Sequence, residues 1–264
     1  MNSLKVTAIP LDIVWADKDE NLYATSRILA TVDKDTDVVV LPELFSTGFL
    51  SSPELLSKYA EDASDSPTVA KILEWAKHYN FAISGSLLVK DNGNFINRGF
   101  FIEPSGDMTF YDKTHLFRLS SEAEHFTPGN ETIPVIRYRG WNIAMAICYE
   151  VRFPVWLRNR HYEYDLLLVP ANWPVKRAYA WKHLLIARAI ENQAFVVGAN
   201  RSGKDDSGQY DGLTYIFNYL GKPIGTVAET PSGLVSAVLD RDKLNAYRES
   251  FPVDEDADSF VLRR

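Results

Sequence analysis

Two spacings of hydrophobic residues divide the chain into strands and helices. Strict alternation, or a short unbroken apolar run, predicts a strand because successive side chains of a strand point to opposite faces. The segments with this pattern are residues 4–9, 37–41, 81–89, 95–102, 108–111, 135–138, 141–147, 165–170, 194–200, 213–217, 223–227 and 234–239. Apolar residues three or four positions apart predict helices over residues 17–32, from Pro67 onward, and over residues 153–160, 178–192 and 240–249.

The order of these elements predicts one α/β domain spanning residues 1–264. The runs Asp37-Val-Val-Val-Leu-Pro42 and Asp165-Leu-Leu-Leu-Val-Pro170 are typical of strands covered on both faces, and they look like equivalent elements of two similar halves. Turn signals at residues 91–94 and 104–106 insert a run of hairpins between the halves, so we expect mixed sheets. Residues 203–212 are interpreted as a polar loop, and residues 251–264 as an acidic C-terminal tail.

Composition narrows the class of protein. The chain has 264 residues, of which 46% are hydrophobic and 24% charged, and its formal net charge of −7 argues against nucleic-acid binding. Its apolar runs are strand-sized, so we expect no membrane span. The single cysteine and the lack of a recognisable signal peptide favour the cytoplasm. The five histidines are scattered, so we expect no metal site.

The single cysteine, Cys148, is the first candidate for chemistry. It follows the apolar strand predicted over residues 141–147 and precedes Pro154, which suits the first turn of a helix. The unpaired N–H groups at a helix N-terminus lower the pKa of a thiol and stabilise an oxyanion. A lone cysteine is more often a buried structural residue, so the interpretation depends on its neighbours.

Two charged residues end other predicted strands and are of the types that a cysteine nucleophile needs. Glu43 follows the strand at residues 37–41, and Lys113 follows the strand at residues 108–111. Either residue alone is also compatible with an ordinary surface position. Because functional groups collect at the carboxyl ends of such strands, we predict that both lie near Cys148. The carboxylate then accepts the thiol proton, and the lysine stabilises the developing oxyanion.

The motifs around these residues resemble those of the nitrilase superfamily of carbon–nitrogen hydrolases, over essentially the whole chain. The motifs are Leu41-Pro-Glu43-Leu-Phe, Tyr111-Asp-Lys113-Thr-His-Leu-Phe117, Cys148-Tyr-Glu-Val-Arg-Phe-Pro154 and Trp181-Lys-His-Leu-Leu-Ile-Ala-Arg188-Ala-Ile-Glu191-Asn192. The resemblance implies a four-layer α-β-β-α sandwich, a homodimer, and Glu43, Lys113 and Cys148 as the catalytic triad. It also implies a second catalytic glutamate before Pro128-Gly129, for which Glu122 fits best and Glu124 is the alternative.

The reaction implied by the resemblance is amide hydrolysis that needs neither a metal nor an organic cofactor. Glu43 removes the thiol proton, Cys148 attacks the amide carbon, and Lys113 and the backbone N–H of Tyr149 hold the oxyanion. Ammonia departs, and water activated by Glu43 then hydrolyses the thioester. Two rival hypotheses are a non-hydrolytic acyltransferase and a catalytically silent binding protein.

Within the superfamily the sequence is most similar to the omega-amidase branch, whose substrates are 2-oxoglutaramate and related 2-oxo acid amides such as 2-oxosuccinamate. Tyr149 is typical of amidases, and the segment Asn172-Trp-Pro-Val-Lys-Arg177 resembles this branch. Glu150, where aspartate is more usual, and Thr214, where serine is frequent, depart from it. The alternative substrates are N-carbamoyl amines and short aliphatic amides.

An anionic substrate requires a cation at some distance from Cys148, preferably the planar guanidinium of an arginine. The candidates are Arg152, Lys176, Arg177 and Arg201. Arg177 is the first choice because it lies between Trp173 and Trp181, whereas Arg152 has an alternative interpretation as an ion-pair partner of Glu150 or of another acid. The predicted substrate-binding residues are Arg177, Arg152, Trp173 and Phe117.

The C-terminal tail predicts a partner surface. Four apolar residues, Phe251, Phe260, Val261 and Leu262, follow the last element that could bury them. We therefore expect a homodimer formed partly by the helices near residues 153–160 and 178–192 and closed by residues 251–264. The other expected partner is the small amide substrate.

Overall fold

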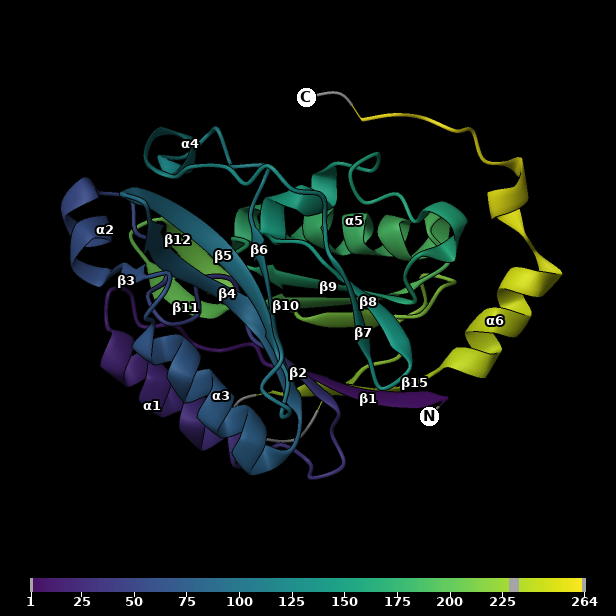
Figure 1. The fold of residues 1–264 in the computed structure, drawn as a ribbon, viewed down its shortest axis with the longest axis horizontal. Coiled ribbons are helices and arrows are strands. Elements are labelled where there is room, and N and C mark those ends of the chain that lie inside the picture. Colours follow the sequence, from purple (N-terminus) through teal and green to yellow (C-terminus); the bar gives the residue numbers. More distant parts are fainter. Residues whose placement is uncertain (1, 228–232, 263–264) are drawn as a thin grey trace.

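Two facing β-sheets form the centre of the computed structural model, which describes residues 2–227 and 233–262 (Figure 1). The strands of the first sheet are β1 (Ser3–Ala8), β2 (Val38–Val40), β3 (Glu61–Asp62), β4 (Ala82–Asp91), β5 (Asn94–Ile102), β6 (Met108–Asp112), β14 (Thr226–Val227) and β15 (Val235–Asp240). Their order is β14-β15-β1-β2-β4-β5-β6, with β3 paired to β4. Parallel pairing of β1, β2 and β4 and antiparallel pairing at both sides make this sheet mixed, as predicted.

The second sheet is also mixed. Its strands are β7 (Val135–Tyr138), β8 (Trp141–Met145), β9 (Leu166–Ala171), β10 (Phe195–Asn200) and β13 (Tyr215–Phe217). They lie in the order β13-β10-β9-β8-β7, with the parallel strands β8, β9 and β10 in the middle. The parallel strands β2, β9 and β10 are nearly continuous apolar runs, because each is covered on both faces.

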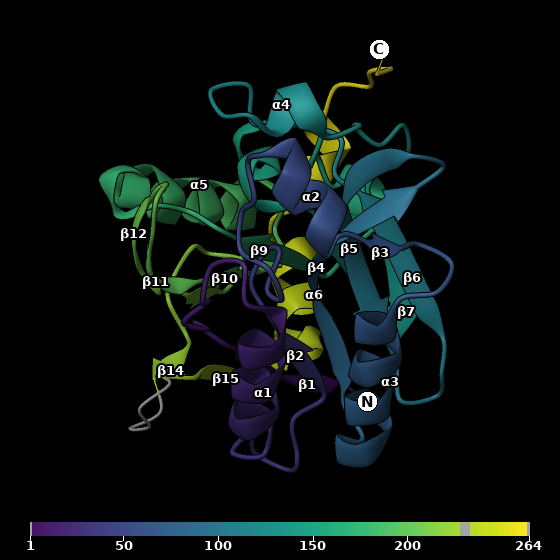
Figure 2. The ribbon, with the colours of Figure 1, turned by 90° about the vertical axis from the view of Figure 1, so that its left-hand side faces the viewer.

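Helices cover the outer face of each sheet. The helices are α1 (Lys18–Leu29), α2 (Pro53–Tyr59), α3 (Pro67–Tyr79), α4 (Glu122–His125), α5 (Ala178–Glu191) and α6 (Arg241–Ser250), and the short 3₁₀ helices are η1 (Cys148–Arg152), η2 (Arg160–Tyr162), η3 (Val175–Arg177) and η4 (Val253–Asp256). Helices α1 and α3 lie on the first sheet and α5 lies on the second, as Figures 1 and 2 show. The four-layer α-β-β-α sandwich implied by the family resemblance is therefore confirmed.

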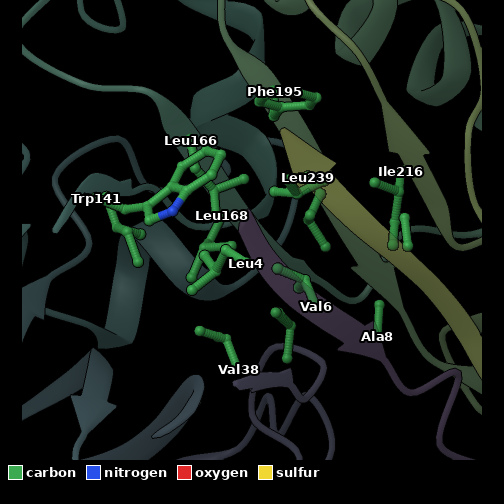
Figure 3. Close-up of a cluster of buried hydrophobic side chains, with 14 of the residues drawn as sticks. Leu4, Val6, Ala8, Val38, Trp141, Leu166, Leu168, Phe195, Ile216 and Leu239 are labelled. Carbon is green, nitrogen blue, oxygen red and sulfur yellow. The ribbon is translucent and has the colours of Figure 1, made fainter. Parts of the chain in front are cut away.

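The core between the sheets is built from aliphatic and aromatic side chains (Figure 3). Leu4 and Val6 of β1 and Val38 of β2 face Trp141 of β8 and Leu168 of β9, and all five are fully buried. Because such a core is packed as densely as an organic crystal, it fixes the relative position of the two sheets. The loops at the carboxyl ends of strands from both sheets are thereby held against one another.

The structure supports the equivalence of the two halves. Asp37 precedes β2 and Asp165 precedes β9, and each uses a carboxylate oxygen to accept the backbone N–H of the neighbouring strand. The bond from Lys5 N to Asp37 Oδ2 is 2.8 Å long, and that from Asn142 N to Asp165 Oδ2 is 3.2 Å. Each aspartate therefore anchors the start of a buried strand to its neighbour in the same way.

The helix predicted over residues 153–160 is wrong. The chain instead forms η1 over Cys148–Arg152, followed by one turn in which Leu157 N donates to Phe153 O over 3.2 Å. A proline disfavours helical backbone angles at the residue before it, and Phe153, which precedes Pro154, has φ −109° and ψ 89°. The proline therefore ends the 3₁₀ helix rather than starting a longer one.

Helix α2 was not predicted, and a two-stranded hairpin replaces the polar loop predicted over residues 203–212. Helix α2 begins with Ser52 as the N-cap and Pro53 as its first residue, the same signal that correctly predicts α3 at Ser66-Pro67. The second element is a hairpin of β11 (Ser202–Asp205) and β12 (Gly208–Asp211). Its turn is closed by the Asp205 carboxylate, which accepts the backbone N–H groups of two residues in the turn.

The described part of the chain, residues 2–227 and 233–262, has no helix that is long and apolar enough to cross a membrane. In the C-terminal tail, Phe251 and Val261 are exposed in the single chain, while Arg160 lies over the ring of Phe260 at 5.7 Å. The homodimer stays a prediction.

Replacement of Leu168 by alanine tests the core between the sheets. We expect Leu168→Ala to lower the free energy of unfolding by about 2–5 kcal/mol, because it leaves a cavity between two sheets that cannot close fully. Val238→Ala is the control, since Val238 lies on β15 but is 63% exposed, and it should cost less than about 1 kcal/mol. Urea unfolding curves measure both values. Equal losses for the two variants would contradict this assignment of the core.

Candidate active site

Cys148 lies at a sharp turn between a buried strand and a 3₁₀ helix. Strand β8 ends at Met145, Ala146 N still donates to Leu168 O of β9, and Cys148 is the first residue of η1. The φ angle of Cys148 is +46°, in the left-handed region that costs energy for any residue with a β-carbon. A strained residue of this kind persists only where its surroundings hold it.

Lys113 lies between two buried glutamates. Its Nζ is 2.8 Å from Oε1 of Glu43, and 2.7 and 3.0 Å from the two carboxylate oxygens of Glu122. The side chains of Lys113, Glu43 and Glu122 are 2%, 2% and 0% exposed. Glu124 is exposed, so the structure brings Glu122, and not Glu124, to the lysine.

Further hydrogen bonds fix the two carboxylates in place. The side-chain amide of Asn97 donates to Glu43 Oε1 at 2.8 Å and to Glu122 Oε1 at 3.3 Å. The backbone N–H of Asn172 donates to Glu43 Oε2 at 3.0 Å, and that of Phe117 donates to Glu122 Oε2 at 2.6 Å. Asn97 was not predicted as a site residue. Its signal in the sequence is an amide side chain in the middle of the apolar strand β5.

Burial and charge set opposite protonation preferences in this cluster. Burial alone lowers the pKa of Lys113, but the neighbouring Glu122, Glu43 and Cys148 together raise it above its ordinary value, so the ammonium form persists. Burial, and then the charge of Glu43, raise the pKa of Cys148 well above its ordinary value despite the opposing effect of Lys113. The expectation of a thiol pKa lowered by a helix N-terminus is therefore wrong. Cys148 is held as a thiol that needs a base.

The cluster lines a pocket of about 450 Å³. The residues that line the pocket are Glu43, Phe49, Lys113, Phe117, Leu119, Ser120, Glu122, Cys148, Tyr149, Arg152, Asn172, Trp173, Pro174, Lys176, Arg177, Ser207 and Tyr210. Every residue predicted for the site is among them. Sequence reasoning missed the contributions of Phe49 and of the β11–β12 hairpin, which supplies Ser207 and Tyr210.

Two arginines on the pocket wall are free to take an anion. Arg177 lies with its Cζ 5.0 Å from the ring centroid of Phe117, and Arg152 with its Cζ 4.8 Å from that of Trp173. Among the described residues, neither arginine has a carboxylate within ion-pair distance. The alternative pairing of Arg152 with Glu150 is therefore wrong, because the Glu150 carboxylate accepts hydrogen bonds from other groups.

Arg201, another candidate cation, has a structural role instead. It is fully buried, forms an ion pair with Asp205, and donates a hydrogen bond to the backbone carbonyl of Ile13. Its guanidinium also lies 4.3 Å from the ring centroid of Tyr210. Arg201 thus holds the β11–β12 hairpin against the rest of the fold. The candidate cations that line the pocket are Arg152, Lys176 and Arg177.

A buried thiol beside a carboxylate and an ammonium is a typical set of catalytic groups in enzymes that cleave acyl bonds through a covalent intermediate. Residues 5–249 match the carbon–nitrogen hydrolase family model, and the chain belongs to this family.

Similar proteins cover almost the whole chain. The chain is 39% identical over 267 residues to "omega-amidase YafV" of Yersinia enterocolitica, a match that covers 99% of this chain and 100% of that protein. It is 31% identical over 254 residues to "2-oxoglutaramate amidase" of Bacillus subtilis, with 95% and 96% covered. The structure is similar to that of XC1258 from Xanthomonas campestris, a superfamily protein with an arsenic adduct in its active site, with a TM-score of 0.93, 37% identity and full coverage of both chains.

Removal of the central cation tests the buried cluster. We expect Lys113→Met to lower the free energy of unfolding by about 3–5 kcal/mol, because it leaves two buried carboxylates without a counter-charge. Lys71→Met is the control, since Lys71 pairs with Glu74 on the surface and should cost less than about 1 kcal/mol. Urea unfolding near neutral pH gives both values. An unchanged stability of Lys113→Met would contradict the cluster.

Proposed function

We propose that the protein is an omega-amidase that hydrolyses the terminal amide of 2-oxoglutaramate, or of a related 2-oxo acid amide, to the acid and ammonia. The observation that carries the proposal is one pocket that contains both a Glu43, Lys113 and Cys148 cluster and two arginines that have no carboxylate partner among the residues that the structure describes. The names of the relatives from Yersinia enterocolitica and Bacillus subtilis support the same substrate class.

Acylation begins with the thiol of Cys148. Because burial disfavours the free thiolate, we assign Glu43 as the base that takes the proton as the sulfur attacks the amide carbon. The carbonyl oxygen then becomes an oxyanion, which Lys113 and the backbone N–H of Tyr149 stabilise. Collapse of this intermediate expels the amide nitrogen, which takes the proton from Glu43 and leaves as ammonia. The product on the enzyme is a thioester of Cys148.

Deacylation uses the same groups. Glu43, held by Lys113, Asn97 and the Asn172 N–H, takes a proton from a water molecule that attacks the thioester. The sulfur departs and regains its proton, and the acid product leaves. Glu122 accepts hydrogen bonds from Lys113 and Phe117, so we assign it the role of holding the ammonium in place through both steps.

Substrate selection depends on the cations of the pocket wall. An acid amide carries its carboxylate at the end away from the scissile bond, and Arg177 offers a planar guanidinium for it. We place the carboxylate on Arg177, with Arg152 as the neighbouring cation, and the stem of the substrate between Phe117 and Trp173. The cytoplasmic location favoured by the single cysteine is also part of this proposal.

Replacement of the nucleophile tests the covalent mechanism. We expect Cys148→Ala to lower the rate of ammonia release from 2-oxoglutaramate by more than about a thousandfold, because no other group in the pocket can form the thioester. Its urea unfolding curve should stay close to that of the original protein, since only one sulfur atom is lost. Substantial activity in a folded Cys148→Ala protein would exclude the mechanism, and no ammonia from any amide with the original protein would favour a binding protein.

Replacement of Arg177 tests the substrate class. Loss of a charge-assisted contact to a desolvated carboxylate costs about 2–4 kcal/mol, so Arg177→Ala should lower kcat/KM for 2-oxoglutaramate by about one to three orders of magnitude. The kcat/KM for a neutral short amide such as butyramide should fall much less. Arg27→Ala, on the exposed side of α1, is the control for a general loss of positive charge, and it should leave kcat/KM for both substrates unchanged.

The same comparison separates the alternatives. The assignment to 2-oxo acid amides would be wrong if Arg177→Ala lowered kcat/KM equally for both substrates. It would also be wrong if neutral amides or N-carbamoyl amines were the better substrates of the unaltered protein. The parallel variant Arg152→Ala decides between the two arginines, because the residue that binds the carboxylate should show the larger loss on the anionic substrate.

A further inference from the structure

Glu150 is a buried acid with an unusual set of partners. Its carboxylate is 0% exposed, and among the described residues it has no lysine or arginine within ion-pair distance. Four donors satisfy it instead. Oε1 accepts the hydroxyl of Tyr111 at 2.6 Å and the backbone N–H groups of Thr114 and His115 at 3.0 and 3.2 Å, and Oε2 accepts the backbone N–H of Ile147 at 2.8 Å.

These donors flank two of the residues in the cluster described above. Ile147 immediately precedes Cys148 in the chain, and Thr114 immediately follows Lys113. One carboxylate therefore binds the turn that carries the thiol to the segment that carries the ammonium. The two segments come from different sheets, because Lys113 follows β6 of the first sheet and Cys148 follows β8 of the second.

The strained backbone of Cys148 needs bonds from its neighbours, and Glu150 supplies one of them. The left-handed backbone angle of Cys148 persists only if neighbouring bonds hold it, and the bond from Ile147 N to the Glu150 carboxylate closes the turn on its N-terminal side. Tyr111 adds rigidity, since its hydroxyl also accepts a hydrogen bond from the indole of Trp156 at 3.3 Å. Among the described residues, the titratable side chains in contact with the Glu150 carboxylate are Tyr111 and His115, whose Nδ1 is 3.6 Å from Oε1.

We propose that Glu150 is a positioning residue that holds the Cys148 thiol at its working distance from Glu43 and Lys113 by tying the two segments together. The inference deepens the proposed function and rests on it for the reaction that benefits. Glu150 itself does not line the pocket, so its effect should fall on the reactivity of the thiol and on kcat, and not on substrate affinity.

Alkylation by iodoacetamide tests this inference without any substrate. Cys148 is the only cysteine in the chain, so a single mass increase in the intact protein reports its alkylation. In the reaction a sulfur–carbon bond forms, iodide leaves, and the thiol proton passes to the base. In Glu150→Gln, the side-chain nitrogen cannot accept a hydrogen bond, so at least one of the backbone N–H groups loses its partner.

We expect Glu150→Gln to be alkylated at least about tenfold more slowly than the original protein near neutral pH. Its rate should rise steeply with pH and approach that of the original protein in alkaline solution, because proton removal then depends on hydroxide and no longer on Glu43. Glu150→Asp keeps the charge but shortens the reach, so it should show a smaller loss of the same kind and serves if Glu150→Gln does not fold.

Asp165→Asn is the matched control. Asp165 is also a buried carboxylate that links two segments, through Asn142 N at 3.2 Å and Arg248 at 2.9 Å, but it lies outside the pocket. Its folded molecules should be alkylated at the original rate with the original pH profile, although the protein is less stable.

Alkylation rates and pH profiles of both Glu150 variants that match the original protein would overturn the inference. With 2-oxoglutaramate, kcat of Glu150→Gln should fall by about 10- to 100-fold and KM should change less than about threefold. If the original protein released no ammonia from any amide while the alkylation rates still differed, the proposed function would fail and the positioning role would stand.

Discussion

The burial of an ammonium between two carboxylates is the constraint on which the site depends. Removing three charges from water costs several kcal/mol for each ion, and this cost is offset only if every charge is paired and hydrogen-bonded. Lys113 meets both glutamates, while Asn97, the Asn172 N–H and the Phe117 N–H occupy the remaining acceptor positions. Such a cluster requires that segments from both sheets meet with little freedom, which the packed core between the sheets provides.

The same burial explains the chemistry. A thiol in this environment has a pKa well above its ordinary value, and the proposed mechanism therefore assigns its proton to a neighbouring base. Charges that are already in place need no reorganisation when an oxyanion forms, and their effect is stronger where water is excluded. The outer part of the pocket has the opposite character, because arginine side chains lie on aromatic rings and remain available to an anion. The proposed function accordingly assigns the buried cluster to the reaction and the arginines to substrate binding.

Much of the site could be predicted because Glu43, Lys113 and Cys148 each lie within three residues of the carboxyl end of a strand, and these ends from the two sheets lie close together. The four-layer sandwich was predicted from the family resemblance, together with the alternation of strands and helices along the chain. The role of Asn97 could not be predicted, because it depends on the register that places β5 beside β6. The raised pKa of Cys148 depends on burial, which local sequence does not reveal.

Other differences have local causes. The apolar side of residues 153–160 favoured a helix, but the backbone restriction that Pro154 places on Phe153 was the stronger effect. The β11–β12 hairpin was interpreted as a loop because its residues are polar, and its pairing depends on the side chain of Asp205 in the turn and on the buried Arg201 beneath it. Helix α2 begins with Ser52-Pro53, the same N-cap and proline signal as Ser66-Pro67 at the start of α3, so this helix is predictable from the sequence.

The central claim is that one pocket holds the amide at Cys148 and the carboxylate at the arginines. A crystal structure of the Cys148→Ala protein with 2-oxoglutaramate bound tests this claim most directly. The account predicts that the amide group lies beside residue 148 with its oxygen toward Lys113 and the Tyr149 N–H, and that the carboxylate contacts Arg177. A substrate bound in the reverse orientation, with its carboxylate at Lys113 and its amide at the arginines, would contradict it.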